Sequence, residues 1–167
     1  HPSVVTTNGI DGWPQASDIS STAAIVMETS TNTVLYSKNA DQALYPASAV
    51  KVMTCLVALE NSSLDDQVTM TATGVSGVTD GGANISSQLD EVFTMEQCLY
   101  AIMVASANDI ALQVAEHVGG SVDAFVQTMN ARAQELGCTN TVFTNPTGLP
   151  DENQHITAHD MALIMEA

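Results

Sequence analysis

Apolar residues fall in short runs along the chain, and the first runs predict a β-hairpin. Residues 22–28 and 33–37 are both strand-like, and the sequence Thr-Ser-Thr-Asn between them is typical of a slightly long turn. The preceding residues 1–21 are rich in Ser, Gly, Pro and Asp, and we expect them to form a loose leader. The folded region is therefore expected to begin with two paired strands.

The longest apolar pattern covers residues 47–60 and predicts a buried helix, because apolar side chains occupy nearly every face of it. Residues 68–89 are rich in Thr, Gly and Ser, and one or two short strands at most are expected there. A final helix capped by Thr157 has no stop signal before Ala167, so we expect the sequence to end inside an element. Three further helices are predicted between these segments, each with a capping or stop signal: residues 95–105, 109–118 and 121–136.

Composition indicates a strongly acidic chain that forms a core. Its 167 residues are 45% apolar, which suffices for one domain. Only 3 Lys and Arg stand against 19 Asp and Glu, so the formal net charge of -16 repels phosphate backbones and we expect no nucleic-acid partner. No apolar run is long enough to cross a bilayer. The 3 cysteines cannot all pair within one molecule, and without a Cys-x-x-Cys motif they suggest neither a metal site nor a redox pair.

Ser48 and Lys51 are the sharpest candidates for chemistry. Their spacing is close to one helical turn, so both side chains would share one face at the start of the predicted buried helix. A helix N-terminus stabilises developing negative charge, and burial lowers the pKa of a lysine until its neutral amine can accept a proton. The alternative is a capping serine followed by a lysine whose amine reaches water. Because lysine is scarce here and Lys51 lies in an apolar run, we favour an activated serine nucleophile.

Ser106 and Asn108 are the second candidates, at a break between two predicted helices. A plain helix-to-helix turn capped by either residue would explain them without any function. A short exposed turn is also a good place to project a hydroxyl and an amide into a cleft. There the hydroxyl could relay a proton and the amide could hold a substrate peptide group.

Taken together, these motifs resemble the active-site serine enzymes that bind penicillin, which use Ser-x-x-Lys, then Ser-x-Asn, then Lys-Thr-Gly. Residues 24–39 resemble the opening hairpin of that superfamily, and residues 45–54 resemble its nucleophile segment. The whole resemblance covers residues 22–167. Three later segments resemble the low-molecular-mass penicillin-binding proteins of the D-alanyl-D-alanine carboxypeptidase family specifically: residues 125–136, 145–149 and 157–162.

The resemblance implies a role for each candidate. Ser48 would attack the carbonyl between the two terminal D-alanines of a peptidoglycan stem peptide, and Lys51 would take its proton. Ser106 would pass the proton to the leaving D-alanine, while Asn108 would bind the substrate amide. The backbone N–H of Ser48 would supply half of the oxyanion hole, and β-lactam antibiotics would acylate the same serine. No cofactor is implied.

The fold implied by the resemblance is α+β of the β-lactamase and transpeptidase type, with an antiparallel sheet flanked by helices. A helical subdomain would hold Ser106 and Asn108, and Ser48 would lie on the floor of a cleft between subdomain and sheet. The expected organisation is a leader at residues 1–21 and an incomplete catalytic domain at residues 22–167. Because peptidoglycan lies outside the membrane, the resemblance also implies an extracellular or cell-surface protein, membrane-associated at full length.

The main departure from the superfamily pattern is the absence of Lys-Thr-Gly, since the two lysines are Lys38 and Lys51. In the superfamily that triplet lies on a later strand that supplies the second oxyanion donor. We therefore expect the strand beyond residue 167, and only the first two strands of the sheet within this chain. Such an incomplete sheet predicts exposed apolar surface and self-association, and the chain could be inactive unless another copy or fragment completes it.

Other functions are less well supported. His155 and His159 have a spacing that can present two metal ligands, but no His-Glu-x-x-His motif accompanies them, so no metal site is expected. A Ser-His-Asp triad would need a Gly-x-Ser-x-Gly turn, which is absent. A β-lactamase of the same superfamily would need a deacylating carboxylate, and no Glu-x-x-Leu-Asn sequence occurs. The absent third motif favours a non-catalytic cell-wall binding or sensor domain, whereas the presence of all four candidate side chains argues against it.

Overall fold

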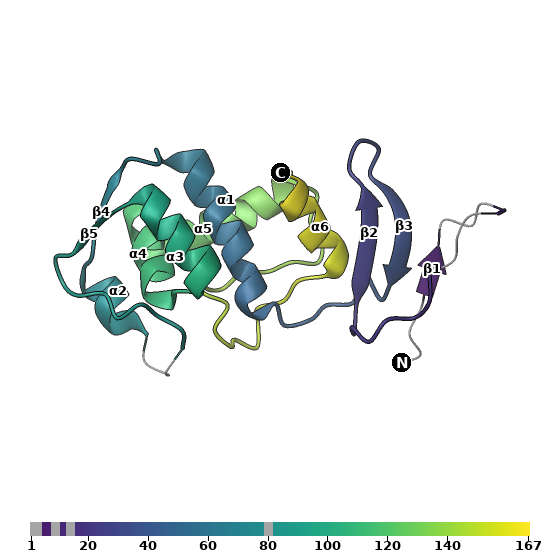
Figure 1. Cartoon of the computed structure of the whole chain (residues 1–167), viewed down its shortest axis with the longest axis horizontal. Helices are drawn as coiled ribbons and strands as arrows, with labels where there is room; N and C mark the ends of the chain where they lie inside the picture. Colours follow the sequence, from purple (N-terminus) through teal and green to yellow (C-terminus); the bar gives the residue numbers. More distant parts are fainter. Residues whose placement is uncertain (1–4, 8–10, 13–15, 79–81) are drawn as a thin grey trace.

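A computed structural model of the chain describes residues 5–7, 11–12, 16–78 and 82–167. Figure 1 shows a long molecule with a small antiparallel sheet at one end and a group of helices at the other. Helix α6 (Ala158–Glu166) lies between them and packs against strand β2 (Ala24–Glu28). No helix among the described residues is long and apolar enough to span a bilayer.

The predicted hairpin is confirmed, with β2 antiparallel to β3 (Thr33–Lys38) and a register shift after Val26. The expectations of a wholly loose leader and of only two strands are wrong, because β1 (Val5–Thr7) pairs with the other edge of β3. The β-branched composition of β1 suits a strand despite its polar surroundings. The rest of the leader is described only at residues 11–12 and 16–21.

Lys38 at the end of β3 holds the described part of the leader against the sheet. Its amine pairs with the carboxylate of Asp18 at 2.8 Å and also donates to the carbonyl of Ile19. The amine is buried, whereas Asp18 is exposed. One of the three cations of the chain is therefore used in structure rather than in a site.

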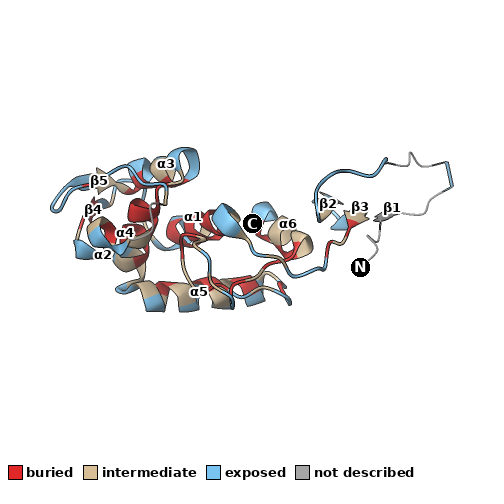
Figure 2. Ribbon diagram, turned by 90° about the horizontal axis from the view of Figure 1, so that it is seen from below, coloured by how far each residue is buried: buried red, intermediate tan, exposed pale blue. Residues whose placement is uncertain are grey.

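Helix α1 (Val50–Asn61) is the central element, as its apolar pattern predicts. A short 3-10 turn, Ala47–Ala49, leads into it. The buried side chains of α1 contribute to two apolar clusters, one including Phe125 and Phe143 and the other including Met95 and Ile110. In Figure 2 the buried residues gather on the facing sides of the helices, while the sheet is mostly half-buried or exposed. Three of the helices around α1 match the predicted ones: α3 (Met95–Ala105), α4 (Asn108–Gly119) and α5 (Val122–Glu135).

Residues 67–94 differ from the prediction, because a helix forms where only short strands were expected. Strand β4 (Gln67–Thr69) pairs with β5 (Val92–Thr94), and α2 (Ala72–Gly77) lies between them in sequence. The α2 N-terminus is fixed from α4: the side-chain oxygen of Gln113 accepts from the backbone N–H of Thr71 at 2.8 Å. Tertiary contacts therefore override the weak helix propensity of this stretch.

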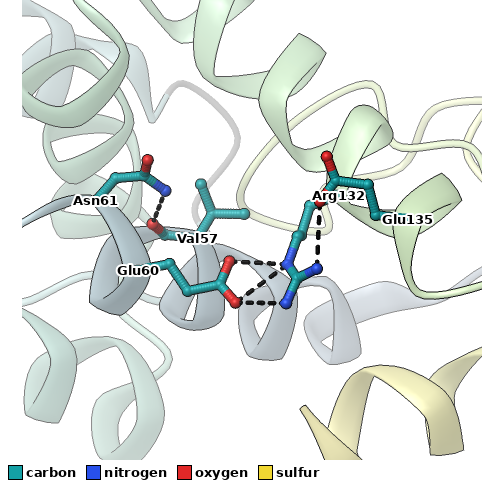
Figure 3. Close-up of polar contacts among 5 residues, drawn as sticks. All are labelled: Val57, Glu60, Asn61, Arg132 and Glu135. Carbon is teal, nitrogen blue, oxygen red and sulfur yellow. Dashed lines mark hydrogen bonds and ion pairs between the residues drawn. The ribbon is translucent and has the colours of Figure 1, made fainter.

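Arg132 joins α1 to α5 at the surface (Figure 3). Its guanidinium donates to both carboxylate oxygens of Glu60, from Nε at 2.9 Å and from Nη2 at 2.7 Å, and it also pairs with Glu135 at 3.2 Å. With Lys38 paired to the leader, Lys51 is the one cation in the described part of the chain that has no ion pair.

Candidate active site

Ser48 and Ser106 meet in space although they lie 58 residues apart in sequence, with Oγ atoms 3.3 Å from each other. Ser48 sits in the turn before α1, and Ser106 is the residue that ends α3. Two residues at this contact have left-handed backbone, Ala47 with φ 46° and Ser106 with φ 54°. Such conformations are unfavourable for residues with a Cβ and persist where the surrounding structure imposes them. The fold therefore imposes the pairing of the two hydroxyls.

Lys51 lies in the first turn of α1 with only 3% of its surface exposed. Burial lowers the pKa of its amine below the ordinary 10.5, and Cys55, one turn further along, partly opposes this effect. The Lys51 Nζ donates to the backbone carbonyl of Thr147 at 2.6 Å. The described residues include no hydrogen bond between Lys51 and Ser48, so the predicted closeness of the two side chains is not realised as a direct bond.

The loop at residues 145–148 supports both Lys51 and the turn that carries Ser48. Thr54 Oγ1 donates to the carbonyl of Pro146 at 2.7 Å, so α1 binds two successive carbonyls of this loop. Gly148 has φ 79°, and a Cβ there would overlap the carbonyl of Ala47. Only glycine therefore allows the loop to approach the turn that carries Ser48 this closely.

Asn108 is the first residue of α4 and is buried, with 4% of its surface exposed, which corrects the expectation of an exposed turn. Its backbone N–H donates to the carbonyl of Ala83 at 2.8 Å. Its side-chain oxygen Oδ1 is buried without a hydrogen-bond partner in the described structure. A buried amide oxygen without a partner is uncommon, and it is suited to accept a hydrogen bond from a bound ligand.

An apolar pocket of about 300 Å³ borders the turn that carries Ser48. Ser48 itself is exposed at the surface and does not line this pocket, and its expected position on the floor of a cleft stays a prediction. The residues that line the pocket come from both sides of the contact between the turn and the loop: Tyr45, Pro46, Ala47, Gly148, Leu149, Pro150, Asp151 and Gln154.

The two histidines that could have suggested a metal site serve other contacts. His155 forms a β-bridge with Val142, and His159 Nδ1 lies 3.3 Å from a carboxylate oxygen of Asp41. Among the described residues, no group of three or more His, Cys, Asp or Glu side chains could hold a metal ion.

Sequence reasoning missed two supporting groups: the carbonyl of Thr147, which binds Lys51, and the carboxylate of Asp109, which lies next to Asn108 in sequence and accepts from Ser87 Oγ at 2.7 Å. The Asn-Pro-Thr-Gly sequence was a signal for the first, because Asn, Pro and Gly mark a tight turn whose carbonyls point in defined directions. An acidic residue in the first turn of α4 was a signal for the second.

The fold is that of the penicillin-binding proteins. The solved structure of the D-alanyl-D-alanine carboxypeptidase DacD from Francisella tularensis superposes with a TM-score of 0.85 at 32% identity, covering 96% of this chain and 40% of that one. Penicillin binding protein 5 from Haemophilus influenzae also gives a TM-score of 0.85, at 31% identity over 92% of this chain and 46% of that one.

Residues 11–167 match the D-alanyl-D-alanine carboxypeptidase family, peptidase family S11, and the chain belongs to this family. The D-alanyl-D-alanine carboxypeptidase DacF of Bacillus subtilis is 38% identical over 147 residues, which are 85% of this chain and 37% of the relative. The chain thus spans well under half the length of this relative.

Proposed function

We propose that the protein is a serine D-alanyl-D-alanine carboxypeptidase that removes the terminal D-alanine of peptidoglycan stem peptides through an acyl-enzyme. The observation that carries the proposal is the 3.3 Å contact between the hydroxyls of Ser48 and Ser106, with the buried Lys51 three residues after Ser48. Family membership over residues 11–167 supports the same activity.

Ser48 is the proposed nucleophile and Lys51 its base. The Ser48 Oγ attacks the carbonyl carbon between the two D-alanines, and its proton passes to the neutral amine of Lys51. A lowered pKa favours that neutral form, and the hydrogen bond to the Thr147 carbonyl fixes one N–H. The lone pair of the amine is then left free to accept the proton.

Ser106 is proposed to carry the proton to the leaving group. Its Oγ lies within hydrogen-bonding distance of Ser48 Oγ, so it can donate to the nitrogen of the departing D-alanine while it receives a proton from Lys51. When the C–N bond breaks, the peptide remains as an ester on Ser48. Water then hydrolyses the ester and returns the serine.

Asn108 is proposed to bind the substrate, because its buried Oδ1 has no hydrogen-bond partner in the described structure and an amide oxygen can accept from a peptide N–H. The backbone N–H of Ser48 is proposed as one oxyanion donor, since it lies at the N-terminal end of α1 and has no backbone partner in the described structure. A β-lactam would use the same contacts and leave a stable ester.

The proposed substrate places the protein at the cell surface or outside the cell, where peptidoglycan and β-lactams are met. The proposed catalytic domain covers residues 22–167. In the described structure β2 pairs only with β3, so its other edge is open to a further strand. We propose self-association through that edge, and a single monomeric species in light scattering would contradict it.

Release of free D-alanine from a synthetic peptide that ends in Lys-D-Ala-D-Ala tests the activity. The intact protein should release one D-alanine per peptide, and Ser48→Ala should release none. Ser63→Ala, at an exposed serine beyond the end of α1, is the matched control and should retain full activity. Release by Ser48→Ala at the rate of the unchanged protein would contradict the proposed function.

A further inference from the structure

We infer that Asn145 is a positioning residue for the proposed reaction, because its side chain fixes the loop whose carbonyl holds Lys51. The inference rests on the proposed function and goes beyond it, since Asn145 is not expected to touch the substrate. It acts through the Thr147 carbonyl on one side and through Gly148 on the other.

The side chain of Asn145 organises the whole turn that follows it. Its Oδ1 accepts from the backbone N–H of Thr147 at 3.2 Å, from Thr147 Oγ1 at 3.0 Å and from the backbone N–H of Gly148 at 2.8 Å. Its Nδ2 donates to the carbonyl of Leu149 at 3.1 Å. One side chain therefore replaces the backbone partners that a regular element would have given this segment.

The side chain of Gln154 fixes the backbone of Asn145. It is 1% exposed, and its Oε1 accepts from the backbone N–H groups of Thr144 at 3.0 Å and Asn145 at 3.2 Å. Its Nε2 also donates to the carbonyl of Leu149 at 3.4 Å. The loop is thus held by two side-chain amides, one of them almost fully buried, and has few ways to shift as a unit.

The loop at residues 145–148 also contacts α1 and the turn that carries Ser48. Lys51 and Thr54, three residues apart on α1, bind the carbonyls of Thr147 and Pro146. Gly148 abuts the carbonyl of Ala47, the residue before the nucleophile. A rotation of the 145–148 turn would therefore move the acceptor of Lys51 and loosen the Ser48 turn together. Small displacements of this kind reduce rates strongly, by up to ~10²-fold for a shift of about 1 Å.

Asn145→Ala in the intact protein tests the inference, with Asn130→Ala as the matched control. Asn130 also binds the backbone, accepting from the N–H of Phe143 at 2.9 Å and donating to the carbonyl of Phe143 at 2.8 Å, but in the described structure it has no bond to Thr147. We expect Asn145→Ala to slow acylation by a β-lactam about 10-fold to 100-fold. Asn130→Ala should acylate at the unchanged rate even where it unfolds more easily. Asn145→Ser keeps an oxygen at this place and should recover part of the rate.

The pKa of Lys51, measured from the titration of lysine carbon resonances by NMR, provides a readout that requires no catalysis. The hydrogen bond to the Thr147 carbonyl stabilises the charged amine of Lys51. Displacement of that carbonyl in Asn145→Ala should therefore lower the Lys51 pKa further, whereas Asn130→Ala should leave the Lys51 pKa unchanged. Cys55 is the titratable side chain that acts on Lys51 in the described structure, and it is the same in both variants. An unchanged Lys51 pKa in Asn145→Ala would overturn the inference, whatever the acylation rate. A protein that never acylates but shows this pKa change would overturn the proposed function and leave the placement of Lys51 by Asn145 intact.

Discussion

The two sides of the candidate active site are held in opposite ways. On one side, the amine of Lys51 is already bound by the Thr147 carbonyl, within a turn built from uncharged groups. On the other side, the side-chain oxygen of Asn108 is buried and has no partner in the described structure. The comparison suggests that the lysine side is preorganised for proton transfer, whereas the asparagine side keeps its acceptor for a ligand.

The supporting groups differ in charge as well. Asp109, beside Asn108, accepts from the backbone N–H of Ser87 at 3.1 Å, from Ser87 Oγ at 2.7 Å and from the N–H of Ile85 at 3.3 Å. No carboxylate pairs with Lys51 in the described structure, although the chain has 19 acidic residues. A carboxylate there would raise the pKa of Lys51 and keep the base protonated. The carboxylate of Asp109 therefore supports the asparagine side of the candidate site, and no carboxylate pairs with Lys51, the proposed base, in the described structure.

The largest expected effect comes from removing the preorganised amine. Lys51→Met fills the same buried space without a base, so acylation by a β-lactam should slow by ~10²–10⁴-fold. Lys38→Met is the matched control, since Lys38 is also buried but binds Asp18 and the carbonyl of Ile19 instead of the loop that holds Lys51. The acylation rates are measured at a fixed pH by stopping the reaction at successive times and determining the labelled fraction of the protein. Equal rates for Lys51→Met and the unchanged protein would show that Lys51 is not the base.

Gly148→Ala should have the next largest effect, because it breaks the contact between the loop at residues 145–148 and the turn that carries Ser48. Gly120→Ala is the matched control: Gly120 has φ 74°, close to the φ 79° of Gly148, but nothing lies near its added Cβ. The left-handed backbone alone should lower the free energy of unfolding by about 1–2 kcal/mol in Gly120→Ala. The overlap with Ala47 should bring the loss in Gly148→Ala to about 3 kcal/mol or more. Equal midpoints of both variants in urea unfolding would contradict this packing.

Asp109→Asn should weaken the asparagine side. The carboxylate of Asp109 accepts hydrogen bonds from N–H and O–H groups. An amide would point its own N–H group at one of these donors, so the free energy of unfolding should fall by about 1–3 kcal/mol. Asp123→Asn, in the first turn of α5 and exposed, should lose only about 0.3–1 kcal/mol of helix-dipole interaction. The affinity for a β-lactam should fall only in Asp109→Asn. Indistinguishable unfolding curves for the two variants would exclude Asp109 as a support.

The smallest expected effect is a pH dependence of stability that originates at Lys51. Because its pKa is lowered below 10.5 in the folded protein, the unfolded chain binds more protons between that lowered pKa and 10.5. The contribution of Lys51 to stability should therefore increase as pH rises through this window. The difference in unfolding free energy between the unchanged protein and Lys51→Met should follow the same rise, and a difference independent of pH would contradict the lowered pKa.

Residues 47–60 and the helix caps could be predicted because their signals are local. The apolar pattern and the cap at Thr157 depend on neighbours in sequence, and both match the structure. Strand β1 and helix α2 could not be predicted, since each depends on a distant partner, β3 for the strand and α4 for the helix.

The sequence was sufficient to identify the candidate side chains of the site, but not the bonds that hold them. Ser48, Lys51, Ser106 and Asn108 were identified, and their roles remain predictions. The bond between Lys51 and the Thr147 carbonyl could not be found from sequence, because every residue has a carbonyl and only the fold selects one. Burial of Asn108 depends likewise on the loop that reaches it through Ala83.

Intact-mass spectrometry after incubation with a penicillin tests the central claim, that Ser48 is an activated nucleophile. The account predicts a single covalent adduct on the intact protein and none on Ser48→Ala. An adduct of the same yield on Ser48→Ala, or no adduct on the intact protein, would contradict it.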